Sequence, residues 1–510
     1  MNQPLPHLII RLAESDNVVL ARAGIAAGTD IGDVLAAQDI PAGHKLAARA
    51  IRKGEAVIKG GFAIGLASEN LPAGTWVHSH NLIADDTATA LRDAGAPAAS
   101  PLPVAAAGRR ATFQGFVRAD GRVATRNYIG VFVAGNCGAS AARKVADWFT
   151  ESRLAAYPNV DGVVPFVHEI GCGMEMTGEP MDLLRRTLSG TIRNPNIAGA
   201  LVIALGCERN NIYGFLEQEK LAVGTALKTL VMQEIGGTAN TIEAGIAIIK
   251  DMLPAANACS RQPVSAEHLV VGLQSAGADG FSAVSANPAL GAAVDLLVAQ
   301  GGTAILSETV DLVSLGHRFI ARAATPEVAG ELAQRIGWWE QYHAGRDTQL
   351  NRRQRADGGA SGLSNALEKA ASGVQRAGSS PVTAVYAYAN PVTARGLVFM
   401  DAPSYEAVSA TGQIAGGANL ICLSTGTGSG FGALPAPTIK LASNTQTFQR
   451  MEDDLDIDCG QVLDGETTVA EMGQRIFAQM LRHASGEKTC SEALGVGENE
   501  FVPWPIGVLA

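Results

Sequence analysis

From residue 115 onward the chain repeats one pattern: a short apolar run, a glycine-containing turn, and a stretch suited to a helix. Runs that indicate buried strands occur at 128–133, 160–167, 200–205, 268–273 and 303–306. Strands that are apolar throughout are typical of parallel sheets covered by helices on both faces. Ligands of such sheets bind beside the carboxyl ends of the strands. The pattern therefore predicts an α/β body with parallel sheets and a site at the strand ends.

The N-terminal part differs from this body. Short β-like runs such as 7–10 and 17–20 are separated by turns that contain Gly and Pro. Strands of that length and spacing predict a small all-β domain over residues 1–84. Residues 85–112 are rich in Ala and Pro and have little periodicity, which predicts a linker.

The length of 510 residues also predicts several domains, because a single core rarely grows beyond about 300 residues. A polar stretch within 340–380 places a boundary near residue 375. It divides the body into a first α/β part, 113–375, and a C-terminal α/β segment, 376–510.

Charge and cysteine usage narrow the partners and the compartment. A net charge of −10 argues against nucleic acid, which requires clustered Lys and Arg, but it permits a small anionic substrate. The seven cysteines are odd in number and form no C-x-x-C pair, so a disulfide framework is not expected. The N-terminus lacks a signal-peptide pattern, and no apolar run approaches the roughly 20 residues of a membrane helix. We therefore expect a cytoplasmic protein that binds neither nucleic acid nor membrane.

The first candidate site is His78-Ser79-His80-Asn81, at the end of the β-domain. On an extended strand, His78 and His80 would share a face and could supply two ligands to a divalent metal. The alternative is two ordinary surface histidines, which is the commoner meaning of an isolated H-x-H. The position before the linker, where the pair could face the body, favours the metal interpretation.

Two Gly-Cys turns follow predicted strands, at Cys172 and Cys207. Each thiol could be a metal ligand or simply a small buried apolar side chain. The neighbouring carboxylates of Glu169 and Glu208 could act as a general base or only cap a helix. Glu308, after the run 303–306, is a further acid or base candidate.

Two turns rich in small residues are candidates for binding a substrate carboxylate. The first contains Asp279 and leads to Asn287; it could present helix N–H groups to an anion or be a plain tight turn. The second, 424–432, alternates glycines with hydroxyls and precedes Lys440 and Asn444. It is neither a Walker loop nor a dinucleotide fingerprint, which argues against ATP and NAD.

Taken in order, these pieces resemble the altronate/galactarate dehydratase family over nearly the whole chain. The co-linear pieces are Asp16-Asn17-Val18, Gly43-His44-Lys45, Val77-His78-Ser79-His80-Asn81, Gly121-Arg122-Val123-Ala124-Thr125-Arg126-Asn127, Gly171-Cys172, Leu205-Gly206-Cys207-Glu208, Asp279-Gly280, Ala286-Asn287-Pro288 and Pro437-Thr438-Ile439-Lys440.

The resemblance implies an N-terminal SAF-type (β-clip) domain on an α/β dehydratase body. It also implies removal of water from a sugar acid, an aldonate or aldarate, with a divalent metal that is typically Fe²⁺, Mn²⁺ and Mg²⁺ being alternatives. By the same resemblance, His78, His80, Cys172 and Cys207 are expected to bind the metal. Arg126-Asn127 is expected to bind a substrate carboxylate, and a homo-oligomer, most simply a dimer, is expected.

The chain departs from the family pattern in three places. Relatives have Cys-Gly-Gly-Ser-Asp where this chain begins with Ser275, and Thr-Gly-Arg-Gly-Thr where it has Thr427 in place of Arg. Their Asn-Pro-x-Pro-Gly-Asn loop has no counterpart within 347–362. One alternative to the dehydratase is a carbon–sulfur lyase acting on a sulfolactate-like acid, because the family has a sulfolactate-cleaving branch. The three departures favour a second alternative, an inactive hydroxy-acid-binding protein.

Overall fold

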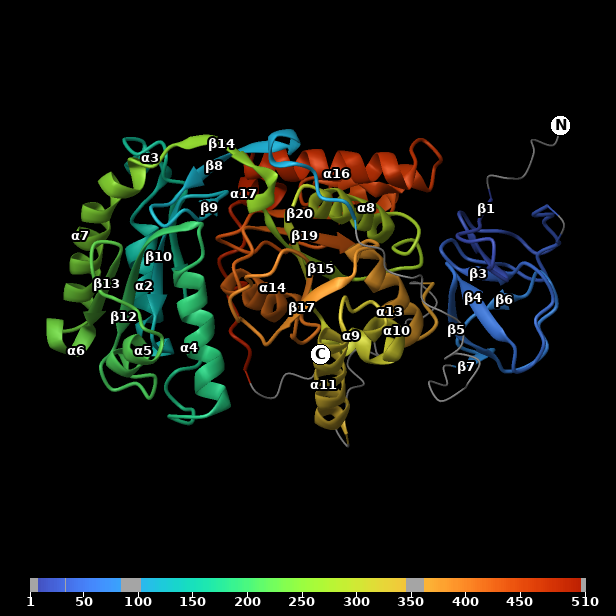
Figure 1. Cartoon of the computed structure of the whole chain (residues 1–510), viewed down its shortest axis with the longest axis horizontal. Helices are drawn as coiled ribbons and strands as arrows, with labels where there is room; N and C mark the ends of the chain where they lie inside the picture. Colours follow the sequence, from blue (N-terminus) through green and yellow to red (C-terminus); the bar gives the residue numbers. More distant parts are fainter. Residues whose placement is uncertain (1–7, 33, 84–101, 345–361, 506–510) are drawn as a thin grey trace.

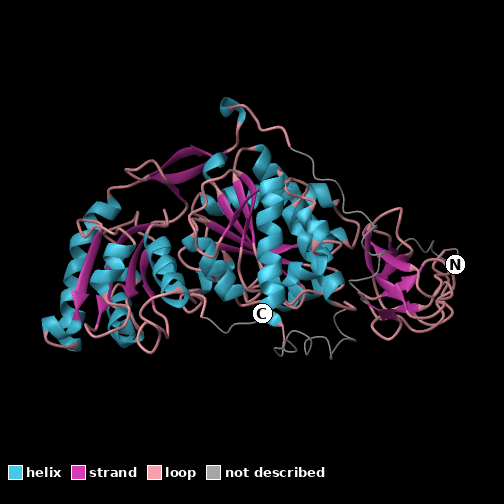
Figure 2. Cartoon of the chain, turned by 60° about the horizontal axis from the view of Figure 1, so that its bottom comes forward, coloured by secondary structure: helices cyan, strands magenta, loops and turns pink. Residues whose placement is uncertain are grey.

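The structure, a computed structural model, describes residues 8–32, 34–83, 102–344 and 362–505. Three parts lie in a row: the β-domain at one end, the C-terminal α/β domain in the middle, and the second α/β domain at the other end (Figure 1). In both α/β domains helices flank the strands, while the described part of the β-domain has none (Figure 2). The predicted fold class is confirmed. No helix among the described residues is long and apolar enough to cross a bilayer.

The β-domain consists of two small antiparallel sheets. One contains β1 (Ile9–Ile10), β2 (Val18–Ala21), β3 (Lys45–Ala47) and β6 (Trp76–Val77), and the other β4 (Ala56–Lys59), β5 (Phe62–Ala67) and β7 (Leu82–Ile83). Alternate residues of β2 enter different apolar clusters, Val18 on one face and Val19 on the other. The strand is therefore buried on both faces although it has only four residues.

The second domain contains a four-stranded parallel sheet in the order β11-β10-β12-β13. Its elements are β10 (Tyr128–Val133), β11 (Gly162–Phe166), β12 (Ile197–Ala204), β13 (Leu227–Val231), α2 (Ala139–Asp147), α3 (Glu151–Leu154), α4 (Glu179–Ile192), α5 (Ile212–Gln218), α6 (Met232–Ile235) and α7 (Thr238–Asn257). Val131 of β10 packs with α2 and α7, and Phe132 packs with α4 and α5 on the opposite face. Helices on both faces explain the uninterrupted apolar strands in the sequence.

A three-stranded antiparallel sheet links the second domain to the C-terminal domain. It consists of β8 (Thr112–Val117), β9 (Val123–Ala124) and β14 (Arg261–Ser265), with β8 in the centre. Residues 84–101, the larger part of the predicted linker, lie outside the described residues. The linker was predicted to end at residue 112, where β8 begins.

The C-terminal domain holds a seven-stranded parallel sheet in the order β17-β18-β16-β15-β19-β20-β21. Its strands are β15 (Val270–Ala276), β16 (Thr303–Leu306), β17 (Val382–Tyr386), β18 (Gly396–Met400), β19 (Leu420–Thr425), β20 (Thr438–Ala442) and β21 (Ile457–Asp458). Its α-helices are α8 (Ala286–Ala299), α9 (Thr309–Leu312), α10 (His317–Ile320), α11 (Pro326–His343), α13 (Ala366–Val374), α14 (Glu406–Ala415), α15 (Thr445–Arg450), α16 (Val469–Ala484) and α17 (Cys490–Leu494). Cys422 of β19 faces α8 and α16, and Leu423 faces α14.

The predicted boundary near residue 375 is wrong. β15 and β16 precede it in the chain, and β17 to β21 follow it, yet all seven strands hydrogen-bond into one sheet. The boundary within the body lies instead between α7 and β15, where the chain leaves the second domain through β14. Hydrophobic patterning cannot show this, because strands on either side of residue 375 have the same apolar character.

Candidate active site between the β-domain and the C-terminal domain

Two of the predicted substrate-binding residues, Asp279 and Asn444, meet at the carboxyl edge of the seven-stranded sheet. Asp279 follows β15, and Asn444 follows β20 and caps α15. Asn444 donates to Asp279 Oδ2 at 3.1 Å, and Ser443 Oγ donates to the two carboxylate oxygens at 2.9 and 3.0 Å. Burial raises the pKa of Asp279 despite these donors. The strand ends therefore build a buried polar cluster at the edge where parallel sheets bind ligands.

The β-domain docks on this edge through close backbone contact. A Cβ on Gly280 would lie 1.9 Å from the carbonyl oxygen of Gly43, and a Cβ on Gly362 would lie 2.2 Å from the same oxygen. No side chain fits at such distances, so the approach requires glycine at both positions. The contact brings His44 and Lys45, the next two residues of the β-domain, to the segment that carries Asp279.

Three buried charged groups form a cluster across this junction. Glu368 of α13 contacts Lys59 Nζ at 2.7 Å and Lys45 Nζ at 2.9 Å, and all three side chains are almost completely excluded from solvent. Burial lowers the pKa of Lys45 to about 8, although Glu368 opposes the shift. Burial alone would raise the pKa of Glu368, but the two ammonium groups hold it well below its usual range.

His78 lies beside this cluster, in a turn rather than on a strand. β6 ends at Val77, and the Asn81 side chain accepts from the His78 N–H and donates to the Trp76 carbonyl. The His78 ring stacks on His44 with centroids 5.2 Å apart, and its Nε2 is buried without a hydrogen-bond partner in the part of the chain that the structure describes. Burial and the charge of Lys45 lower the His78 pKa to about 4, so the imidazole is neutral at physiological pH.

The predicted orientation of the histidine pair is therefore wrong. His78 is buried and His80 is exposed, because the chain turns after Val77 and the alternation of a strand no longer applies. Both rings pack against Trp76, with centroid distances of 5.5 and 5.3 Å. The structure instead pairs His78 with His44, which sequence reasoning did not select.

The predicted metal was tested against the ligands that the structure offers. Among the described residues, no group of three or more His, Cys, Asp and Glu side chains is arranged to hold a metal ion. His78 Nε2 nevertheless fits one ligand position, because it is buried, neutral and has no hydrogen-bond partner. The junction thus offers one candidate ligand atom for a metal among the described residues.

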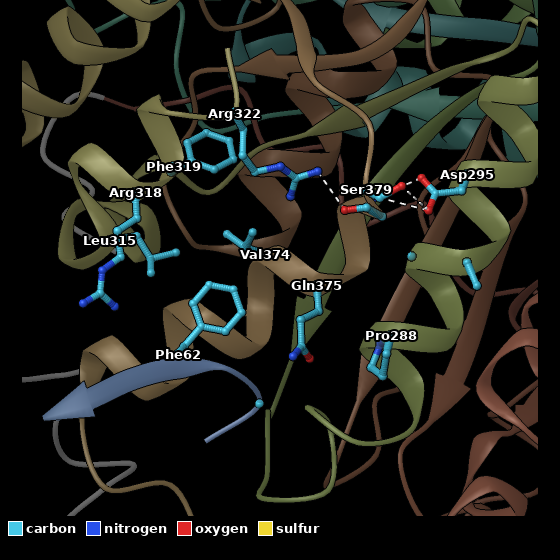
Figure 3. Close-up of a pocket in the computed structure, with 14 residues that line it drawn as sticks. Phe62, Pro288, Asp295, Leu315, Arg318, Phe319, Arg322, Val374, Gln375 and Ser379 are labelled. Carbon is cyan, nitrogen blue, oxygen red and sulfur yellow. Dashed lines mark hydrogen bonds between the residues drawn. The ribbon is translucent and has the colours of Figure 1, made fainter. Parts of the chain in front are cut away.

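A cavity of about 370 Å³ adjoins the junction (Figure 3). Phe62 of β5, Arg318 of α10 and Arg322, from the segment after α10, line the cavity. Arg322 donates to the carbonyl oxygens of Gly378 and Ser380 at 2.7 and 2.8 Å. A smaller space that shares Phe62 is lined by Lys59 and Glu368, so the cavity leads toward the buried charges.

Lys440 and Asn287, two further predicted substrate-binding residues, do not join Asp279. Lys440 lies within β20, and its buried Nζ has no hydrogen-bond partner among the described residues. Burial lowers the Lys440 pKa, although the charge of Asp456 opposes the shift. Asn287 donates to Ser372 and accepts from Ser424 Oγ, so it ties α8 to α13 and β19. Both side chains lie in the interior of the C-terminal domain and not at the candidate active site.

The glycine-rich loop after β19 also lies at this edge. A Cβ on Gly426 would lie 2.4 Å from Asp279 Cγ, so the loop and Asp279 are in direct contact. Arg450 of α15 donates to the Thr427 carbonyl at 2.9 Å. A guanidinium is therefore present beside the position where relatives carry Arg. The altered segment 347–362 lies outside the described residues except for Gly362.

Glu308 follows β16 on the same edge and is held in a strained conformation. Its φ of 68° is in the left-handed region, which is rare for residues other than Gly and Asn. The side chain is buried and ion-paired with Arg376. Burial raises the Glu308 pKa to about 7 although Arg376 opposes the shift. Glu308 can therefore exchange a proton near neutral pH.

Replacing Glu308 with Gln is expected to flatten the pH dependence of unfolding between pH 5 and 7. The folded wild-type chain keeps a proton that the unfolded chain, with a pKa near 4.5, has lost. Its stability should thus fall as pH rises through this range, by at most about 1.4 kcal/mol per pH unit. Urea unfolding at several pH values measures the slope, with the exposed Glu466→Gln as control. An unchanged slope in Glu308→Gln would contradict the raised pKa.

Cys172 and Cys207 lie on the second domain, at the carboxyl ends of β11 and β12. Cys137, which follows the intervening strand β10 and was not selected from the sequence, contacts Cys172 with the two Sγ atoms 3.4 Å apart. The second domain and the β-domain occupy opposite ends of the molecule (Figure 1). The structure therefore does not bring the predicted cysteine and histidine ligands together within one chain.

The predicted catalytic carboxylates Glu169 and Glu208 also lie beside these thiols. Glu208 accepts from the backbone N–H groups of Leu205 and Gly206, so it stabilises its own turn. Glu169 is exposed and accepts from Asn136 at 2.8 Å. Of the three predicted acid or base residues, only Glu308 belongs to the sheet edge at the junction.

Mild oxidation is expected to join Cys137 and Cys172 in a disulfide, because their sulfur atoms are already in contact. Burial and Cys137 raise the Cys172 pKa to about 11, so the Cys172 thiol keeps its proton at neutral pH and the pair needs an added oxidant. Diamide is the added oxidant: each thiol loses one hydrogen, and diamide is reduced by the two hydrogens. Peptide mapping without reductant should detect the linked peptides, with Cys259 remaining unlinked. Recovery of both thiols unmodified would contradict the contact.

The predicted role of Arg126 and Asn127 in substrate binding is wrong. All five Arg126 N–H groups are used: Nε and Nη2 donate to Glu492, and Nη1 and Nη2 also donate to three carbonyl oxygens. Asn127 donates to two carbonyls and accepts from Arg118. The Arg126 donors hold the second domain against α16 and α17, and the Asn127 donors join segments within the second domain, so none is left for a carboxylate.

These features define an α/β protein with a candidate active site where a small β-domain closes the carboxyl edge of a parallel sheet. Comparison with known families gives the same division of the chain. Residues 7–85 match the altronate/galactarate dehydratase SAF domain, 115–257 the D-galactarate dehydratase/altronate hydrolase second domain, and 266–509 the D-galactarate/altronate dehydratase C-terminal domain.

Curated relatives agree over almost the full length. Galactarate dehydratase (L-threo-forming) of Escherichia coli K12 is 32% identical, covering 98% of this chain and 97% of the relative. Altronate dehydratase of the same organism is 30% identical, covering 95% and 96%. The (2R)-sulfolactate sulfo-lyase subunit beta of Chromohalobacter salexigens is 31% identical, covering 77% and 96%. The chain belongs to the altronate/galactarate dehydratase family and is a hydro-lyase.

Proposed function

We propose that this protein removes water from an aldonate or aldarate and forms the 2-keto-3-deoxy acid. Its relatives named altronate dehydratase and galactarate dehydratase support this reaction. The observation that carries the proposal is the buried cluster of Lys45, Glu368 and His78 at the junction. Burying two lysines and a carboxylate is costly, and structural packing alone is achieved more cheaply by apolar side chains. Groups whose pKa values are strongly shifted by burial and by neighbouring charges are typical of sites that transfer protons.

The reaction needs a base for the proton on C2 and an acid for the leaving 3-hydroxyl. Lys45, with a pKa of about 8, is our candidate base, because an appreciable fraction of the amine is neutral near that pH. Glu308, with a pKa of about 7, is the candidate acid on the same sheet edge. After the hydroxide leaves as water, the enol tautomerises to the keto acid.

The metal remains part of this proposal. His78 Nε2 would hold it, and Fe²⁺, with Mn²⁺ or Mg²⁺ as alternatives, would supply Lewis-acid stabilisation of the substrate carboxylate when bound. Asp279, Ser443 and Asn444 would orient the sugar hydroxyls from the strand ends. Cys172 and Cys207 would not bind this metal, and any metal that they hold would occupy a separate thiolate site on the second domain.

Carbon–sulfur cleavage at the same site is the second candidate reaction, because a sulfolactate sulfo-lyase subunit is among the relatives at 31% identity. One experiment separates the two. The protein is purified without oxygen, its metals are measured, and aldonates, aldarates and sulfolactate are supplied. A 2-keto acid from a sugar acid supports the dehydratase, and sulfite release supports the lyase.

The residue assignment is tested with Lys45→Met and with Lys53→Met, which removes an exposed lysine of the same domain. Turnover should be lost in the first and retained in the second, with both proteins folded by circular dichroism. Wild-type turnover by Lys45→Met would remove Lys45 from the reaction. We also propose that the protein is a cytoplasmic homodimer, which analytical ultracentrifugation and cell fractionation would test.

A further inference from the structure

A second cavity lies at the edge of the seven-stranded sheet opposite the candidate active site. Its volume is about 540 Å³, and Val270, Thr303 and Asn419, at the amino ends of β15, β16 and β19, line one side. The other side is α4 of the second domain. At this seam the helices are in backbone contact, since a Cβ on Gly190 would lie 2.4 Å from the Ala415 carbonyl oxygen of α14. The cavity therefore sits between two domains that are packed directly on each other.

Arginines dominate the charge of this cavity. Arg186, Arg193 and Arg395 line it, and no carboxylate in the described part of the chain lies within 4 Å of any of them. Arg193 and Arg395, both exposed, instead donate to backbone carbonyls, so neither is ion-paired with a carboxylate among the described residues. Arg122 also lines the cavity but is paired with Asp120 at 2.7 Å.

The lining carboxylates do not cancel this charge. Glu267 is ion-paired with Arg110, outside the cavity lining. Glu219 accepts a hydrogen bond from Ser189 Oγ at 2.6 Å and has no ion pair among the described residues. Three unpaired guanidinium groups thus face one unpaired carboxylate.

Arg186 is the most informative of the three. Its Nε is buried and has no hydrogen-bond partner among the described residues, and burial lowers the pKa of the group although the charge of Glu219 opposes the shift. A buried donor without an acceptor is unusual in a folded protein. An anion in the cavity would supply that acceptor, and guanidinium groups recognise carboxylate and phosphate oxygens through paired hydrogen bonds.

We propose that this cavity is a binding site for a small dianion, with carboxylate or phosphate oxygens held by Arg186, Arg193 and Arg395. The ligand would contact both the second and the C-terminal domain, and so would bind most tightly when the two are docked. The site is separate from the proposed active site, because it lies at the other end of the same strands.

Isothermal titration calorimetry of the full chain tests the proposal, with succinate, inorganic phosphate and sodium chloride at matched ionic strength as separate titrants. Saturable binding of succinate or phosphate, without a matching signal from chloride, is expected. Arg186→Gln should weaken it about 10-fold or more, the loss expected for charge-assisted hydrogen bonds. Arg153→Gln, which removes an exposed arginine of the same domain, should bind like wild type.

Binding of phosphate alone would assign a phosphate ester, and binding of succinate alone a dicarboxylate. Absence of binding by either titrant, or equal affinity in Arg186→Gln and wild type with both proteins folded, would overturn the proposal. Neither result depends on turnover, so the test stands apart from that of the proposed reaction.

Discussion

Replacing Glu368 with Gln is expected to lower the free energy of unfolding by about 3–5 kcal/mol and to abolish turnover. Glu368 neutralises Lys45 and Lys59 at 2.9 and 2.7 Å in a junction from which water is excluded. Without the carboxylate, two ammonium groups would remain buried and unpaired unless they lost their protons. The β-domain would then dock less tightly on α13. Urea unfolding followed by tryptophan fluorescence measures the loss.

The same substitution should change the acid sensitivity of the protein. The lysines hold the pKa of Glu368 well below its usual range, so its stabilising contribution is complete above its unfolded pKa, about 4.5. This contribution is lost as pH falls through the lower, folded value. Glu55→Gln, which breaks an exposed pair with Arg49, is the matched control and should cost less than about 1 kcal/mol. Equal losses in the two variants would contradict a special role for the buried cluster.

Replacing His78 with Ala is expected to reduce kcat/KM by more than about 100-fold, beyond the 10- to 100-fold typical of residues that only support a metal ligand. Its Nε2 is the buried imidazole nitrogen at the junction that fits a ligand position. His80→Ala is the matched control, because that ring is exposed and packs against Trp76. It should keep activity within about twofold, since exposed substitutions are usually close to neutral.

Metal content distinguishes a ligand from a packing residue. After anaerobic purification, His78→Ala should hold less metal per chain than wild type, while its circular dichroism is unchanged. If His78→Ala keeps both its metal and its kcat/KM, His78 is not part of the site. If His80→Ala loses both, the exposed histidine is the ligand and the assignment is reversed.

The sequence by itself determined the local elements and their class. Apolar runs such as 128–133 and 303–306 became β10 and β16, because a strand covered by helices on both faces must be apolar at every position. The short runs and the Gly and Pro turns before residue 84 became the β-domain. The Asp279–Asn444 cluster could also be predicted from the sequence, since the strand ends of one parallel sheet share an edge.

The tertiary structure alone decided which residues meet. Arg126, Asn127 and Asn287 are polar residues in family motifs, yet their donors are used to join elements. Lys45, Lys59 and Glu368 were not selected, because each is an ordinary charged residue until the β-domain covers α13. No periodicity shows that strands on both sides of residue 375 share one sheet. The histidines and cysteines were predicted as one metal site, but the C-terminal domain stands between them (Figure 1). The local sequence pattern determines which segments form strands and helices and which of their faces are buried. Contacts between domains depend on how the folded surfaces dock.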